Sequence, residues 1–315
     1  MTKTKVLITG ASGLLGRAFM RVFTQNLDQF EIIGLAFSRY DKYVKEFPQL
    51  LKLDLTDPNE LSLLVQSFKP NIIIHSAAER RPDICENDKE ATLKLNVGTT
   101  ETICKLANDV GSRVLVISSD YVFDGKNAPY QVDSPTNPIS FYGETKKASE
   151  DVCLKNVNQK NIVLRVPVLY GQVESLKECS VSMVAQQVVD ALANNKSFEI
   201  DNWQQRYPTL VDDVARVVVQ IIKADENGGI YHFSGDEQFT KYGMAVEMLR
   251  FFTNGDMSKQ NLLIPADAVP TGAARPFDCK LSTTKTVQFI QEKLGQQVCF
   301  SPFIPELIKS LQPFK

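Results

Sequence analysis

The chain has 315 residues, of which 43% are hydrophobic and 23% are charged, a composition typical of globular proteins. Its formal net charge is −2, its pI is about 5.9, and charges of both signs are interspersed. This balance gives no electrostatic reason to expect binding to nucleic acid or to an anionic membrane surface.

The N-terminal stretch and the cysteines bear on the cellular compartment. MTKTKVLITG contains an apolar run of only about five residues, too short for a secretory signal or a membrane span. Six scattered cysteines without a C-x-x-C pair indicate reduced thiols, so we expect a cytoplasmic protein. The two histidines, His75 and His232, lie far from any cysteine or carboxylate cluster, so we expect no metal site.

The first half of the chain alternates strand-like and helix-like segments. Several strand-like runs are apolar on both faces, as expected for parallel strands covered by helices on both sides. This alternation predicts an α/β fold built on a doubly wound parallel sheet. The predicted strands are Lys5–Thr9, Glu31–Phe37, Asn71–Ala77, Arg113–Ser118 and Asn161–Leu169, and the predicted helices are Leu15–Asn26, Asn59–Phe68 and Ala91–Val110.

The alternation weakens after Gly171. A helix is predicted at Ser182–Asn194, a polar segment follows, and the helix Val211–Lys223 and strand Gly229–Ser234 could return to the main sheet. We therefore expect a smaller C-terminal α/β lobe beside the nucleotide-binding domain. The expected division is residues 1–171 for that domain, completed by about 210–235, and residues 172–209 and 236–315 for the lobe.

A glycine-rich turn links the first predicted strand to the first predicted helix. Gly10, Gly13 and Gly16 are spaced G-x-x-G-x-x-G within GASGLLG. The first glycine permits the tight turn, the second lets a pyrophosphate approach the backbone, and the third lets helix and strand pack closely. Free N–H groups at the helix N-terminus then face the phosphates. At this junction the pattern favours dinucleotide binding over a turn that merely tolerates glycine.

The end of the second predicted strand indicates which dinucleotide is bound. NAD-binding proteins usually carry Asp or Glu there, as an acceptor for the ribose 2′-hydroxyl. Here the strand ends in Phe37, Ser38 and Arg39. Arg39 can pair with a 2′-phosphate and Ser38 can donate to it, which favours NADP(H); the alternative is that Arg39 is a solvated loop cation. Asp54, after the next short strand, suits either a hydrogen bond to adenine or a turn.

A hydroxyl, a phenol and an ammonium group form a candidate proton-transfer site. Tyr142 and Lys146 are four residues apart, so on a helix they share one face. A free phenol has a pKa of about 10, and a nearby ammonium group lowers it. A serine hydroxyl at the end of the fifth strand, in Ser118-Ser119, can hydrogen-bond a substrate oxygen. The trio suits proton transfer to an oxygen while a hydride moves between cofactor and carbon.

Together these motifs resemble a known family. GASGLLG, HSAAERRPD, SSDYVFDG, YGETK and LRVPVLYG resemble the extended short-chain dehydrogenase/reductases, in the branch of dTDP-4-dehydrorhamnose reductase. Within that branch, AAERRPD, ISSDYVFDG, WQQRYPT and SGDEQFTKYGMA are similar to the regulatory β subunits of methionine adenosyltransferase. The resemblance covers nearly the whole chain. It implies an NAD(P)-binding Rossmann fold, NADP(H) as the cofactor and a methionine adenosyltransferase catalytic subunit as the partner.

The resemblance also implies roles for particular residues. The reductase triad corresponds to Ser119, Tyr142 and Lys146. Contacts to NADP are implied at Ser12, Gly13, Leu14, Leu15, Phe37, Ser38, Arg39, Asp54, Leu55, Ser76, Arg80, Tyr142, Lys146 and Leu169.

Two functions stay open on the sequence. The segment Glu79–Asp83 departs from the Thr-x-Val-Asp type of the reductase branch, and a long Arg80 or Arg81 would alter the space beside the nicotinamide. This favours an NADP-binding regulatory subunit in S-adenosylmethionine synthesis, unless both arginines belong to a solvated loop. The intact triad favours an NADPH-dependent reductase of a dTDP-sugar. Arg206 and Arg275 suit the pyrophosphate of such a substrate, or surface salt bridges.

Overall fold

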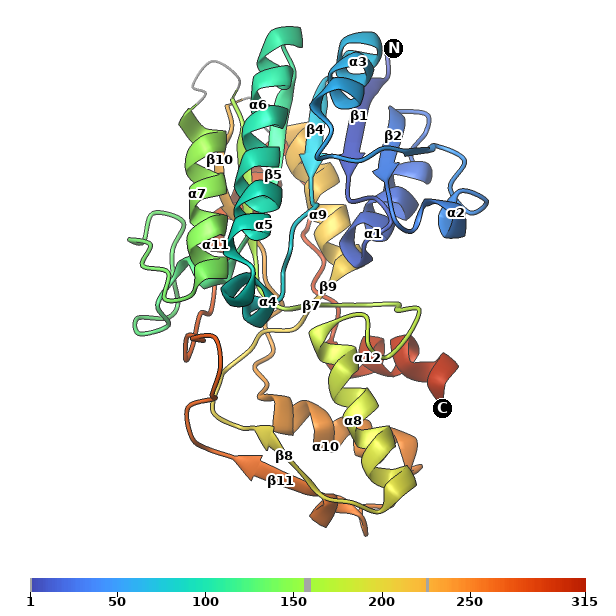
Figure 1. The fold of residues 1–315 in the computed structure, drawn as a ribbon, viewed down its shortest axis with the longest axis vertical. Coiled ribbons are helices and arrows are strands. Elements are labelled where there is room, and N and C mark those ends of the chain that lie inside the picture. The colour runs from blue at the N-terminus through green and yellow to red at the C-terminus, as the bar shows by residue number, and fades with distance from the viewer. Residues whose placement is uncertain (1, 156–159, 225–226) are drawn as a thin grey trace.

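A computed structural model describes residues 2–155, 160–224 and 227–315. Its main element is a seven-stranded sheet with the order β10-β6-β5-β4-β1-β2-β3, in which every neighbouring pair is parallel (Figure 1). The chain runs from β1 outward to β3 and then back across the sheet to β4, so the strand order reverses beside β1. The strands are β1 Thr4–Thr9, β2 Phe30–Ala36, β3 Leu50–Lys52, β4 Ile72–His75, β5 Arg113–Ser119, β6 Ile162–Val166 and β10 Gly229–His232.

Helices cover both faces of the sheet, which explains why the central strands are apolar on both sides. On one face the sheet packs against α1 (Leu14–Thr24), α9 (Val211–Ala224) and α11 (Thr284–Leu294). On the other face it packs against α3 (Pro58–Phe68), α6 (Thr99–Val110) and α7 (Phe141–Lys155). The predicted α/β fold with a doubly wound parallel sheet is therefore confirmed, including the return of the strand near residue 230 to the sheet edge beside β6.

One predicted strand is wrong in its extent. The sequence predicted a single strand over Asn161–Leu169, but β6 ends at Val166 and the chain leaves the main sheet at Pro167. Proline has no N–H to donate to the ladder, so it ends the pairing. Beyond it, β7 (Leu169–Tyr170) pairs with β9 (Thr209–Leu210) in a separate small sheet.

A second group of elements forms a small lobe below the carboxyl edge of the sheet (Figure 1). Its apolar core lies between α8 (Ser180–Asn194), α10 (Lys241–Phe252) and α12 (Phe303–Leu311). The strands β8 (Phe198–Asp201) and β11 (Leu263–Ala266) form a parallel pair at its far end. The exact residues that divide the two domains stay a prediction.

Short helices complete the described chain. α4 (Pro82–Asn87), α5 (Lys89–Leu93) and the π-helical turn Lys94–Gly98 lead into α6, in place of the first part of the predicted helix Ala91–Val110. The remaining helical turns are α2 (Tyr40–Tyr43), Asp120–Val122, Gln260–Leu262 and Gln312–Phe314. Among residues 2–155, 160–224 and 227–315, no helix is both long and apolar enough to cross a membrane. All six cysteines are unbridged, as predicted.

Candidate functional site

The predicted cofactor residues gather at the carboxyl edge of the sheet. Gly10 to Gly13 join β1 to α1, and Leu14 to Gly16 form the first turn of α1. Phe37 to Arg39 follow β2, and Asp54 and Leu55 follow β3. Ser76 and Arg80 follow β4, Ser119 ends β5, and Leu169 begins β7 just beyond β6. In parallel sheets of this topology, ligands bind outside the carboxyl ends of the strands where the strand order reverses.

The glycine loop closes tightly between β1 and α1. Gly10 has a φ of +67°, a left-handed conformation that glycine adopts without strain, and its carbonyl accepts from the Gly13 N–H over 2.8 Å. A Cβ on Gly16 would lie 2.0 Å from that carbonyl oxygen, so a side chain there would force helix and strand apart. α1 begins after Gly13 with no side-chain cap. Its first N–H groups therefore suit a phosphate group.

After β2 an aromatic ring is exposed, whereas the polar side chains after β3 and β4 form hydrogen bonds within the protein. Phe37 is 54% exposed, so its ring is open to a planar ligand. Asp54 Oδ1 accepts from both the backbone N–H and the hydroxyl of Thr56, each over 2.8 Å. This is the turn that the sequence offered as the alternative to an adenine contact. The Ser76 hydroxyl donates to the Thr9 carbonyl over 2.7 Å, which holds β1 and the loop after β4 together.

The structure brings Ser119 and Tyr142 together at the end of β5. The Ser119 hydroxyl donates to Asp120 Oδ1 over 2.9 Å and accepts from the Tyr121 N–H over 3.2 Å. Burial raises the pKa of the Tyr142 phenol above its ordinary value, although its hydrogen bond with Ser119 lowers the pKa in part. The sequence expected Lys146 to lower the pKa of Tyr142; this expectation is wrong, because the pKa is raised and burial is the largest cause.

Lys146 lies one turn along α7 and is only 5% exposed. Burial lowers the pKa of its ammonium group to about 8, while the Glu150 carboxylate raises it in part. Glu150 is buried too: it accepts from Ser118 over 2.5 Å and from two nitrogens of Arg165, each over 2.8 Å. A buried ion pair of this kind fixes the side of α7 that carries Tyr142 and Lys146.

The two histidines are buried in the sheet, as expected for structural residues. His75 Nδ1 lies 2.8 Å from the Thr9 hydroxyl, and burial followed by the charge of Lys146 lowers the pKa of His75 to about 3. His232 Nε2 lies 3.3 Å from Arg165, and burial and that cation lower its pKa to about 3 as well. Both imidazoles are therefore neutral at physiological pH.

On the lobe side, polar residues of the segment 201–206 face Tyr121 and Asp120. The Gln204 side chain donates to the Tyr121 hydroxyl over 3.1 Å, and the Tyr121 ring meets the Tyr142 ring edge-on with centroids 5.8 Å apart. Arg206 pairs with Asp201 over 3.2 Å, and its positive charge lowers the pKa of Asp120 in part. Burial nevertheless raises the pKa of Asp120 to about 7.

A strap of residues 267–276 runs from β11 to the other side of this region and is fastened to α4. Asp83 Oδ1 accepts from the Ala273 N–H over 3.0 Å, and Asp83 Oδ2 accepts from Arg275 over 2.6 Å. Arg275 is thereby held in a salt bridge, as one of the two sequence interpretations expected, although its side chain is only 16% exposed. The strap contacts the very segment, Glu79–Asp83, in which the sequence departs from the reductases.

The two arginines of that segment have different environments. Arg81 is 63% exposed and pairs with Glu79 over 2.6 Å. The Glu79 backbone is clamped by Asn96, which accepts from its N–H over 2.8 Å and donates to its carbonyl over 3.0 Å. Arg80 instead donates to the backbone carbonyl of Glu178. Both arginines are exposed, so the solvated-loop interpretation stays open for Arg80, although its side chain contacts the loop before α8.

Sequence reasoning missed Glu178, which lies in the loop between β7 and α8. Its carboxylate accepts from Arg39 over 2.8 Å and from Arg17 over 2.7 Å. Arg39 is thus in an ion pair with a distant carboxylate, rather than a solvated loop cation. These partners are 139 and 161 residues away in the chain, so no local pattern could have indicated the contact.

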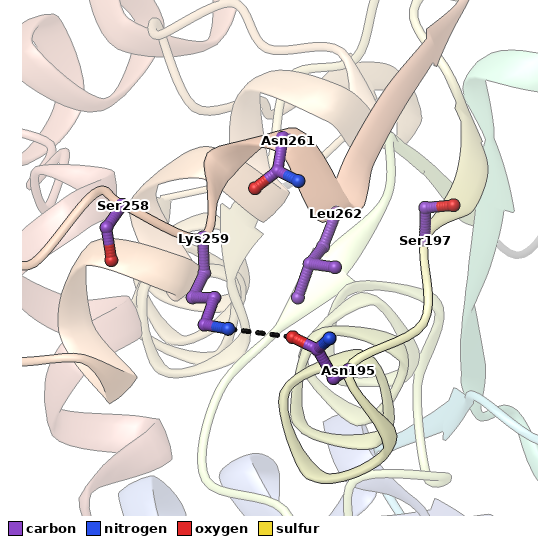
Figure 2. Close-up of a pocket in the computed structure, with 6 residues that line it drawn as sticks. All are labelled: Asn195, Ser197, Ser258, Lys259, Asn261 and Leu262. Atoms are coloured by element: carbon purple, nitrogen blue, oxygen red, sulfur yellow. Dashed lines mark hydrogen bonds between the residues drawn. The ribbon is translucent and has the colours of Figure 1, made fainter.

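A separate hollow in the small lobe is not part of this region. Figure 2 shows Asn195, Ser197, Ser258, Lys259, Asn261 and Leu262 around it, at the end of α8 and beside the turn Gln260–Leu262. The Lys259 ammonium donates to Asn195 Oδ1 over 2.7 Å, so the charged group of this hollow already has a partner. None of the predicted site residues lines it.

Together, the parallel strand order and the glycine loop at its reversal are those of an NAD(P)-binding Rossmann fold. The family described as RmlD substrate binding domain matches residues 4–304, and the chain belongs to this family. Methionine adenosyltransferase 2 subunit beta of Xenopus tropicalis is 41% identical over 315 residues, which cover 98% of this chain and 88% of that protein. The resemblance inferred from the motifs is therefore confirmed.

Solved structures of relatives share the fold. A dTDP-4-dehydrorhamnose reductase from Clostridium acetobutylicum is 26% identical, with a TM-score of 0.76 over 99% of each chain. A dTDP-4-dehydrorhamnose reductase from Bacillus anthracis, solved in complex with NADP, is 22% identical, with a TM-score of 0.77 over 99% of each chain.

Proposed function

We propose that this protein is the NADP(H)-binding regulatory β subunit of a methionine adenosyltransferase, which modulates S-adenosylmethionine synthesis by a catalytic subunit. The observation that carries the proposal is the 41% identity to methionine adenosyltransferase 2 subunit beta, which extends over 98% of this chain. Similarity of this extent includes the small lobe as well as the sheet, so it reaches beyond a shared cofactor fold.

The cofactor part of the proposal rests on the carboxyl edge of the sheet. The pyrophosphate would lie on the glycine loop and the first N–H groups of α1, and Arg39 would face the adenosine ribose at the end of β2. Tyr142 and Lys146 would hold the nicotinamide ribose from α7. The Bacillus anthracis relative was solved in complex with NADP, which supports the same cofactor here.

The region above Tyr142 favours the regulatory function over turnover. The Tyr121 ring meets the Tyr142 ring edge-on and is held by Gln204 from the lobe side, and the strap 267–276 is fastened to Asp83. Both cations that would suit a sugar-nucleotide pyrophosphate, Arg206 and Arg275, are already paired with carboxylates.

The second candidate is an NADPH-dependent reductase of a dTDP-4-keto-6-deoxy sugar, favoured by the complete triad of Ser119, Tyr142 and Lys146. In that reaction bound NADPH would supply a hydride to the carbonyl carbon. The Tyr142 hydroxyl would donate a proton to the ketone oxygen, Lys146 would stabilise the phenolate that remains, and Ser119 would hold the oxygen. The products would be an alcohol and NADP⁺.

Two assays on the purified chain separate the candidates. In the first, the chain is added with NADPH to a methionine adenosyltransferase catalytic subunit, and the rate and the KM for methionine are measured. In the second, NADPH oxidation is followed with a dTDP-4-keto-6-deoxy sugar. We expect the chain to change the rate or the KM for methionine in the first assay. We expect no NADPH oxidation in the second assay. NADPH oxidation that disappears in Tyr142→Phe would establish the reductase instead.

A further inference from the structure

Glu178 belongs to the loop before α8, yet its side chain reaches the cofactor edge of the sheet. The side chain is 8% exposed, and it accepts from Arg17 in bidentate fashion, with Nη1–Oε1 and Nη2–Oε2 distances of 2.7 and 3.0 Å. Arg39 donates to the same Oε1 over 2.8 Å, and Arg80 donates to the Glu178 carbonyl. One residue thus contacts the helix after the glycine loop, the end of β2 and the loop after β4.

Arg17 connects this carboxylate to the glycine loop itself. Its guanidinium donates to the Ser12 carbonyl over 3.1 Å and stacks over the Tyr43 ring at 5.1 Å, and its side chain is only 5% exposed. A buried cation needs a counter-charge, which Glu178 supplies. Burial tends to raise the pKa of Glu178, but hydrogen bonds from Arg17, the Glu174 N–H and Arg39 lower it to about 2. The carboxylate is therefore ionised at physiological pH.

Arg39 remains able to bind an anion while it is paired with Glu178. Its side chain is 36% exposed, and a guanidinium carries five N–H donors, of which the bond to Glu178 uses one. Arg17 and Arg39 contact the Glu178 carboxylate, whereas Arg80 contacts the backbone carbonyl of the same residue. A phosphate monoester carries a charge of roughly −1.5 to −2 at neutral pH, so it can pair with the N–H donors of Arg39 that Glu178 does not use.

We propose that Glu178 is a positioning residue that sets the preference of this chain for NADP(H) over NAD(H). The inference rests on the proposed cofactor function and adds a residue outside the sheet to it. Glu178 holds the Arg39 guanidinium where the 2′-phosphate of the adenosine ribose would bind, at the end of β2. An arginine that is already ordered loses less side-chain entropy when the phosphate binds.

The test compares NADPH with NADH, which lacks the 2′-phosphate. Dissociation constants for both are measured by calorimetry on the full chain, on Glu178→Gln and on Glu174→Gln. Glu174 is a matched control, because it lies in the same loop and 3.7 Å from Arg17 but pairs with Lys42 over 2.6 Å, whereas Arg39 pairs with Glu178. We expect Glu178→Gln to weaken NADPH binding by about tenfold and NADH binding by less than about threefold. Glu174→Gln should keep the wild-type preference.

A double-mutant cycle shows whether Glu178 acts through Arg39. In an Arg39→Gln background, Glu178→Gln should no longer weaken NADPH binding, because the side chain that it positions is absent. Equal losses for NADPH and NADH in Glu178→Gln would overturn the inference and leave a structural role, and so would tighter NADPH binding, which would mean that Glu178 competes with the phosphate. If the wild-type chain binds neither dinucleotide, the proposed cofactor function fails together with this inference.

Discussion

Asp120 makes the stability of the protein depend on pH in a direction opposite to most carboxylates. Burial raises its pKa from 3.8 to about 7, despite the hydrogen bond from Ser119 and the charge of Arg206. Between about pH 4 and pH 7 the folded chain therefore holds a proton on Asp120 that the unfolded chain has lost. The contribution of Asp120 to the free energy of unfolding falls as the pH rises through this window.

We predict that Asp120→Asn removes this dependence. The variant should gain stability relative to the wild type as the pH rises from about 4 to about 7, by about 1–3 kcal/mol, and the difference should then level off. Urea unfolding across this range measures the difference in free energy of unfolding. The titration of His75 and His232 contributes equally to both proteins and drops out of that difference. A difference that stays constant with pH would show that Asp120 is ionised in the folded protein.

At the scale of residues, the sequence identified the side chains of the site better than it predicted their pKa values and partners. Ser119, Tyr142 and Lys146 were predicted from chemistry and spacing, and the structure places them at the carboxyl edge of the sheet. The raised pKa of Tyr142 could not be predicted, because it arises from burial by chain segments distant in sequence. Glu178 was missed for the same reason, since a lone glutamate in a loop carries no pattern.

At the scale of elements, the junction of β1 and α1 depends on Gly16. A Cβ there would meet the Gly10 carbonyl oxygen at 2.0 Å and the Ala11 Cα at 2.7 Å, both backbone atoms that cannot rotate away. We predict that Gly16→Ala destabilises the protein by about 2–3 kcal/mol and abolishes NADPH binding.

Gly98→Ala is the control for this prediction. Gly98 lies within a helical segment, and the nearest atom to an added Cβ is 3.9 Å away. Its stability should remain within about 1 kcal/mol of the wild type, with NADPH binding unchanged. Both variants are compared by thermal unfolding and calorimetry; if Gly16→Ala binds NADPH as the wild type does, the glycine loop is not the phosphate site.

The strap 267–276 is a second element whose position depends on a few contacts. Asp83 holds it to α4 through the Ala273 N–H and Arg275, in a half-exposed salt bridge. We predict that Asp83→Asn speeds amide hydrogen exchange of the strap by roughly threefold to tenfold. The substitution removes the salt bridge to Arg275, while the asparagine amide can still hydrogen-bond the strap.

Asp267→Asn serves as the comparison for the strap. Asp267 lies at the beginning of the strap and accepts from Asn202 over 2.7 Å, so the substitution removes the same charge without touching α4. Exchange in Ala273 and Arg275 should stay at the wild-type rate. Equal rates in Asp83→Asn and the wild type would mean that other contacts hold the strap down.

The sequence was more reliable for the sheet than for what lies beyond it. Strands that are apolar on both faces, separated by amphipathic segments, predicted the parallel sheet. The strand near residue 230 does return to this sheet. The break at Pro167 and the small β7–β9 sheet were missed, because the apolar run continues to Leu169 and the periodicity alone contains no break. Pro167 was the local signal that could have indicated it.

At the scale of the whole molecule, the cofactor edge of the sheet and the small lobe are joined by side chains from both. Glu178, in the loop before α8, bonds to α1 and to Arg39 after β2, and Asp83 on α4 bonds to the strap. A ligand that alters the contacts of Arg39 therefore acts on a residue next to α8. This arrangement is consistent with a cofactor that serves as a regulatory ligand, whose effect on partner binding would be reciprocal.

The most direct test of the proposed function is the affinity of this chain for a methionine adenosyltransferase catalytic subunit, measured by calorimetry with saturating NADPH. We predict a complex with a dissociation constant below about 1 μM, and weaker binding when NADPH is left out. The regulatory function would be contradicted if no complex forms at tens of micromolar of each protein while NADPH is oxidised in the presence of a dTDP-4-keto-6-deoxy sugar.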